Sequence, residues 1–165
     1  MRMRMMPFIS AVMTVFLMAS NLLAHCEIPC GIYDDELRAK LIAEHAGTIR
    51  KSMEAITSLE KATPIDYNQL VRWINNKDDH ANKIQHLVSQ YFMTQRIKPE
   101  APNYEAELKA LHEILVYAMK CKQTLDVKNV DALLKSLEKF NKLYFVHQHS
   151  VPKPTKKKIG QGNKK

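Results

Sequence analysis

The sequence predicts an all-α protein, an up-down four-helix bundle. The chain has 165 residues, enough for one domain with a sizeable core, and only four Gly and seven Pro. Apolar residues recur with helical spacing in four stretches. The links between those stretches are short, about four to nine residues, which favours antiparallel neighbours. The expected organisation is a leader over 1–24, a short segment over 25–34, the bundle over 35–147 and a tail over 148–165.

The first 24 residues have the pattern of an export signal. Arg2 and Arg4 precede an apolar run from Phe8 to Ala19. The run is shorter than the roughly 20 residues that a membrane-spanning helix needs. Cleavage after Ala24 would make His25 the new N-terminus, and the processed chain would be periplasmic or secreted, with no membrane segment. An uncleaved anchor is the alternative that the pattern leaves open.

The first predicted helix begins at Asp34 and Asp35, which we expect to cap it. It should end near Thr63-Pro64, because proline interrupts helical hydrogen bonding. Its apolar residues follow the helical repeat. The expected core positions are Ile42, Ala46, Ile49, Met53 and Ile56.

The second predicted helix begins at about Asp66 and is bounded by Pro99. Its expected core positions are Leu70, Trp73, Ile74, Ala81, Ile84, Val88 and Tyr91. The third begins after Asn103 as N-cap, with Tyr104, Leu108, Leu111, Leu115 and Ala118 facing inward. The fourth follows Asp126 and contributes Val130, Leu134, Leu137, Phe140 and Tyr144.

The positive charge is concentrated at the two ends of the chain. The net charge is +8, but residues 1–24 and 153–165 together hold eight basic residues and no acidic ones. The remaining part, 25–152, holds 17 basic and 17 acidic residues. The bundle is therefore neutral, which argues against a nucleic-acid-binding fold. The Lys-rich tail lacks periodicity and is expected to be disordered.

Reactive side chains gather where the leader would be cut. His25, Cys26 and Cys30 lie within six residues, in the stretch "HCEIPCG". One interpretation is a Cys26–Cys30 disulfide, as exported proteins favour. The third cysteine, Cys121, falls in the last turn of the third predicted helix, where we expect a small buried apolar residue.

The other interpretation is a metal site that cleavage itself completes. His25 would offer its α-amine and imidazole, Cys26 its thiolate and backbone amide nitrogen, and Cys30 a second thiolate. The amine, amide and thiolate form fused chelate rings in one plane, and mixed N/S donors in a square plane suit Ni(II) or Cu(II). Zinc would want four side-chain ligands, and no second Cys/His pair has the right spacing.

The stretch "HCEIPCGIYDD" resembles the nickel hook of the nickel-containing superoxide dismutases. The hook pattern is His-Cys-x-x-Pro-Cys-Gly-x-Tyr-Asp, and Glu27 stands where the family often has Asp. A looser similarity continues through "VRWINNKDDHANKIQHL", so the resemblance covers most of 25–150. It implies a four-helix bundle, assembly as a homohexamer and one nickel ion per subunit, bound by His25, Cys26 and Cys30. It also implies dismutation of superoxide to oxygen and hydrogen peroxide by Ni(II)/Ni(III) cycling.

The resemblance implies roles for residues beyond the hook. Tyr33 would stand beside the open axial side of the metal, where it gates small anions and orders water. In the family a Glu and an Arg lie near the axial imidazole. Glu44 is the nearest acid in this sequence, and His80 occupies the position that corresponds to the Arg. Either side chain would orient the imidazole of His25.

Two other functions remain open at this point. An exported carrier or sensor would bind nickel or copper through the same hook without turnover, and consumption of superoxide separates it from an enzyme. A structural helical bundle with a Cys26–Cys30 disulfide would bind no metal, which the mass of the unreduced chain would reveal.

Overall fold

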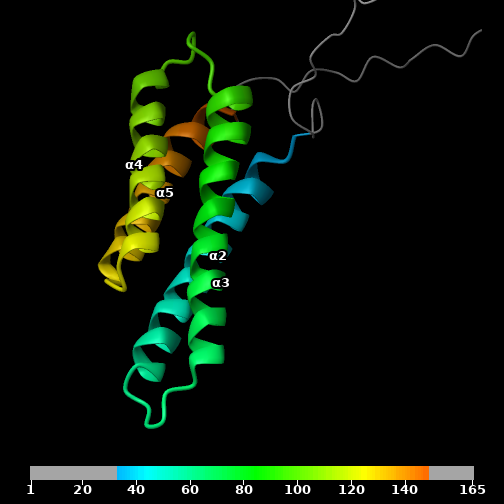
Figure 1. Ribbon diagram of the computed structural model, residues 1–165. Coiled ribbons are helices and arrows are strands. Elements are labelled where there is room, and N and C mark those ends of the chain that lie inside the picture. Colours follow the sequence, from blue (N-terminus) through cyan, green and yellow to red (C-terminus); the bar gives the residue numbers. More distant parts are fainter. Residues whose placement is uncertain (1–32, 149–165) are drawn as a thin grey trace, which may run out of the picture. The chain divides into compact units, whose positions relative to one another are not determined.

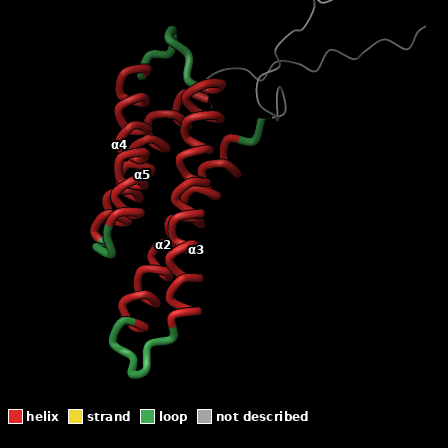
Figure 2. The backbone as a smooth tube through the Cα atoms, in the orientation of Figure 1, coloured by secondary structure: helices red, strands yellow, loops and turns green. Residues whose placement is uncertain are grey.

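The computed structural model describes residues 33–148, and these residues form four antiparallel helices in up-down order (Figure 1). Helix α2 spans Asp35–Leu59, α3 spans Tyr67–His86, α4 spans Tyr104–Gln123 and α5 spans Lys128–Gln148. A π-helical segment, η1 (Leu87–Arg96), continues α3. The described residues contain helices and loops without strands (Figure 2), so the all-α bundle is confirmed.

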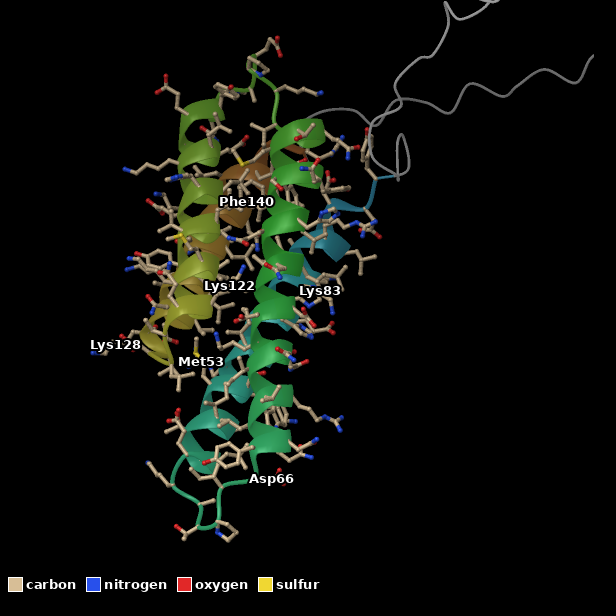
Figure 3. All side chains as sticks on the ribbon, in the orientation of Figure 1. Met53, Asp66, Lys83, Lys122, Lys128 and Phe140 are labelled. Atoms are coloured by element: carbon tan, nitrogen blue, oxygen red, sulfur yellow. The ribbon has the colours of Figure 1, made fainter. Side chains whose placement is uncertain are left out.

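Each helix packs against its neighbours in sequence, and α2 also packs against α5, which closes the bundle. The apolar repeat predicted most of the core, including all five positions expected in α2. Further fully buried side chains come from Phe92, Ile114 and Leu133. Met53 and Phe140, labelled in Figure 3, are both fully buried on their helices. Burial of these faces is the main stabilising contribution to the bundle.

The first two helices depart from the predicted boundaries. Helix α2 ends at Leu59, before the predicted end near Thr63-Pro64, and turns fill the interval. The start of α3 is less buried than its apolar pattern predicted. Ile74 is 38% exposed, and Leu70 and Trp73 are only half-buried. In Figure 1 the α2–α3 hairpin extends beyond the α4–α5 loop, so the start of α3 has fewer helices to pack against.

The helix starts show which capping predictions were right. Asp34 caps α2, because its Oδ1 accepts a hydrogen bond from the Leu37 amide at 2.9 Å. Asp66 caps α3 in the same way, accepting from Gln69 at 3.0 Å. Asn103 occupies the N-cap position of α4 without a side-chain cap bond, and its amide donates to the Leu143 carbonyl at 3.3 Å.

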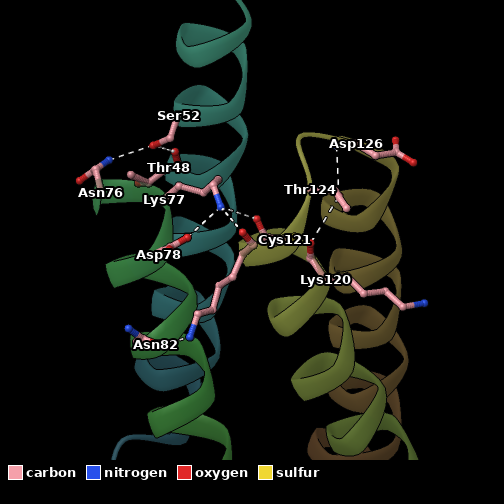
Figure 4. A network of polar contacts seen from close by, with 11 residues as sticks. Thr48, Ser52, Asn76, Lys77, Asp78, Asn82, Lys120, Cys121, Thr124 and Asp126 are labelled. Carbon is pink, nitrogen blue, oxygen red and sulfur yellow. Dashed lines mark hydrogen bonds and ion pairs between the residues drawn. The ribbon is translucent and has the colours of Figure 1, made fainter. Parts of the chain in front are cut away.

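A buried lysine joins α3 to the end of α4 (Figure 4). The Lys77 ammonium donates to the carbonyl oxygens of Cys121 at 2.9 Å and Lys122 at 2.7 Å. It also donates to Asp78 Oδ1 at 2.8 Å. The last carbonyls of a helix have no intrahelical partner, and a cation there also complements the helix dipole. Lys77 therefore acts as a cap supplied by a neighbouring helix.

Candidate functional site

The predicted metal ligands His25, Cys26 and Cys30 lie outside the described residues, and Tyr33 is the first residue that the structure describes. The Tyr33 side chain is exposed. Asp34 follows it as the N-cap of α2, so α2 begins directly after the predicted hook. Among the described residues, those closest in sequence to the hook therefore stand at the start of a helix.

Asp35 has a different role from the predicted cap, because its carboxylate is buried inside the bundle. Its Oδ1 accepts from the Tyr91 hydroxyl at 2.6 Å, and its Oδ2 accepts from the Tyr144 hydroxyl at 2.9 Å. The Arg96 guanidinium approaches with Nε at 2.9 Å from Oδ1 and Nη2 at 2.7 Å from Oδ2. We call these four residues the Asp35 cluster. It ties the start of α2 to η1 and to α5.

The charges in the Asp35 cluster are paired, and its two tyrosines are held in their protonated form. Burial and the adjacent Asp35 carboxylate raise the pKa of Tyr91 and of Tyr144 above the ordinary range, so both phenols remain protonated donors. The two-pronged contact from Arg96 supplies the opposite charge that a buried carboxylate requires. The carboxylate of Asp35 is therefore fully satisfied by donors from two other elements.

The π-helical segment explains how η1 delivers two of these donors. Its backbone bonds join residues five apart, as between the Ile97 amide and the Phe92 carbonyl at 2.9 Å. Tyr91 and Arg96 are also five apart, so they lie one π-turn from each other and both reach Asp35. The sequence predicted an uninterrupted α-helix here. The structure instead has the wider π-helical turn over Leu87–Arg96. Such segments frequently occur at functional sites.

A group of aromatic side chains packs beside the Asp35 cluster. Phe92 lies edge-on to Tyr91, Phe140 and Tyr144, with ring centroids 5.1, 5.0 and 5.8 Å away. Phe140 in turn stacks on Tyr144 at 5.1 Å. Aromatic pairs in these orientations stabilise beyond the area they bury. The packing fixes the two phenol rings that hold Asp35.

His80 and Glu44, the two residues expected near the metal-bound imidazole, lie on α3 and α2. The Nδ1 of His80 is 3.1 Å from the Nδ1 of His45, and the two rings meet edge-on with centroids 4.9 Å apart. Glu44 is exposed, and its charge acts on both imidazoles. The structure thus brings His80 together with His45.

The remaining candidate groups have structural environments. Cys121 is fully buried, and burial raises the pKa of its thiol to about 11, which agrees with the expected small apolar residue. His86 and His112 are exposed on their helices. Over residues 33–148 no group of three or more His, Cys, Asp or Glu side chains is placed to hold a metal ion. Within the same range no helix is long and apolar enough to cross a membrane.

Comparison with known proteins places the chain in a family. The family described as nickel-containing superoxide dismutase matches residues 20–148. The matched range covers both the "HCEIPCG" stretch and all four helices. No curated protein and no solved structure matches the chain.

Proposed function

The chain belongs to the nickel-containing superoxide dismutases, and from that premise we propose that His25, Cys26 and Cys30 hold its nickel ion. The family defines the activity as the oxidoreductase reaction in which two superoxide ions and two protons give oxygen and hydrogen peroxide. It also defines nickel as the cofactor. The observation that carries the residue assignment is the donor set itself, which lies within the matched range.

The chemistry of these donors fits nickel. His25 provides an amine and an imidazole, Cys26 an amide nitrogen and a thiolate, and Cys30 a second thiolate. Anionic thiolate and amide donors push electron density onto the ion, which makes its oxidation accessible to superoxide. Bound nickel supplies one-electron exchange between its two- and three-valent states. We propose one ion per subunit.

Residues around the hook would control access and orientation. Tyr33 has an exposed ring and follows Cys30 by three residues. We assign it the gating of small anions and the ordering of water at the metal. Glu44 and His80 are candidates for orienting the His25 imidazole, since a ligating imidazole needs a partner on its other nitrogen. The exposed carboxylate of Glu44 is accessible for such a contact.

Export and assembly complete the proposal. The leader over 1–24 is removed after Ala24, and the processed chain acts in the periplasm or outside the cell. A homohexamer would cover a small hook beside a small bundle and shield it from bulk water. The basic tail over 148–165 has no role in this scheme.

Blocking the α-amine of His25 tests the assignment. A chain with one extra residue before His25 has an amide in place of that amine, and an amide nitrogen is a much poorer neutral donor. We expect superoxide turnover per chain to fall by more than about tenfold, the lower end of what loss of a supporting metal contact costs. Superoxide decay is followed by stopped-flow spectroscopy, with nickel content measured on the same samples.

The matched control carries the same extra residue after Lys165, at the opposite end of the chain. It should keep full turnover and nickel content. Equal activity in the two extended chains would refute the role of the His25 amine.

A further inference from the structure

The His45–His80 pair has a geometry that the hook does not explain. The two residues come from different helices, α2 and α3, and their Nδ1 atoms approach to 3.1 Å. Both side chains are partly exposed, so solvent and ions reach them. In a hydrogen bond between the two Nδ1 atoms, one nitrogen carries the proton and the other accepts it. A metal ion between them would use both lone pairs instead.

The spacing of the two nitrogens suits a shared metal ion. Transition-metal dications bind imidazole nitrogen at about 2.0–2.1 Å, so two nitrogens 3.1 Å apart would subtend an angle of about 100° at the ion. That angle lies between the tetrahedral and the right-angled arrangements that such ions adopt. An ion at that angle lies off the line between the two nitrogens, so each ring would also have to turn its Nδ1 lone pair toward the ion.

The protonation state of the two histidines also favours a metal ion. Burial is the main cause that lowers the pKa of both histidines. The neighbouring His80 lowers the pKa of His45 further, and Lys83 lowers that of His80. Both rings are therefore biased toward the neutral form, which is the form that binds metals. Lys83 acts on both rings more strongly than Glu44 does, and on His80 more strongly than Asp79 does, so the imidazole lone pairs would bind the cation against the charge of Lys83.

We propose that His45 and His80 form a second metal site, distinct from the hook ligands, for a dication that prefers imidazole, such as Zn²⁺. The ion joins α2 to α3 through the two Nδ1 atoms, and water fills its other positions. Because no third His, Cys, Asp or Glu among residues 33–148 completes a cluster, the site binds more weakly than a closed structural zinc site.

Titration of the processed, nickel-loaded chain with Zn²⁺ tests the proposal. Calorimetry should show one additional Zn²⁺ per chain, with nickel content unchanged afterwards. His45→Gln and His80→Gln should each weaken that binding by at least about tenfold, since each removes one of two ligands. The control is His112→Gln, an exposed histidine on α4, which should leave the titration unchanged.

Nitrogen-15 spectra of the unsubstituted chain provide a readout that does not depend on how the variants fold. Zn²⁺ should shift the Nδ1 resonances of His45 and His80 together and leave both rings protonated at Nε2. Unshifted Nδ1 resonances would overturn the proposal and leave a hydrogen-bonded pair. Zn²⁺ binding by either variant that is as tight as in the unsubstituted chain, or Zn²⁺ uptake that only displaces nickel, would also overturn it.

Discussion

Replacing Cys30 with serine is expected to abolish nickel binding and superoxide turnover. A serine hydroxyl stays protonated at neutral pH and is a hard donor, whereas a cysteine thiolate is a soft anionic donor that favours nickel in its higher state. Loss of a contact that supports a metal ligand lowers metal affinity or activity by about 10–100-fold. Loss of a ligand itself should lower them by more than about 100-fold. The measurements are nickel per chain by mass spectrometry and superoxide decay after rapid mixing.

Cys121→Ala is the matched control for that substitution. Cys121 lies in the core formed by the four helices and is fully buried. Removing its sulfur should cost about 1 kcal/mol of unfolding free energy, as for other small core deletions, while nickel content and turnover persist. If Cys30→Ser kept its nickel and Cys121→Ala lost it, the assignment of the hook cysteines would be wrong.

Asp35→Ala should cause a large loss of stability. The substitution leaves the Arg96 guanidinium and the hydroxyls of Tyr91 and Tyr144 without their shared acceptor. Breaking a buried ion pair by removing one partner costs about 3–5 kcal/mol. The Arg96 side chain is 23% exposed, so water recovers part of that loss and we expect about 3 kcal/mol. Urea unfolding followed by circular dichroism measures the change.

The neighbouring residue gives the control, since Asp34→Ala removes an exposed N-cap of the same helix. Its loss should cost about 1 kcal/mol, the usual value for a capping side chain. Equal losses for the two variants would show that the buried Asp35 cluster adds nothing to the stability of the bundle. Residual turnover in Asp35→Ala then reports how far the start of α2 supports the hook.

The sequence predicted the helices well because their apolar positions recur with the helical period. All five core positions expected in α2 are buried, and α4 begins at Tyr104 directly after the expected cap Asn103. The end of α2 was placed too late, because the charged and polar residues before Pro64 carry no apolar repeat to mark a boundary. The exposed start of α3 shows that an apolar repeat predicts a face and not whether another helix covers it.

The Asp35 cluster could not be predicted, since its members are far apart in the chain. Tyr91, Arg96 and Tyr144 lie 56, 61 and 109 residues from Asp35. Two adjacent aspartates at a helix start both fit a cap, and only the packing decides that Asp34 is exposed while Asp35 is buried. The five-residue spacing of Tyr91 and Arg96 was visible, but it predicts a shared face only in a π-helix.

The predicted hook depended on a different kind of information. A short run of residue types with known donor chemistry indicated a nickel or copper site, and the family match over residues 20–148 identifies nickel. The residue assignment rests on that chemistry, because His25, Cys26 and Cys30 lie outside the described residues. By contrast, the pairing of His45 with His80 required the structure, since the two lie 35 residues apart.

The most direct test of the nickel-hook account is the intact mass and metal content of the processed protein, coupled to a superoxide assay before and after nickel removal. We expect a chain that begins at His25, holds about one nickel per subunit and loses its turnover when nickel is removed. A longer N-terminus that retains full activity, or a Cys26–Cys30 disulfide without nickel in cells supplied with nickel, would contradict it.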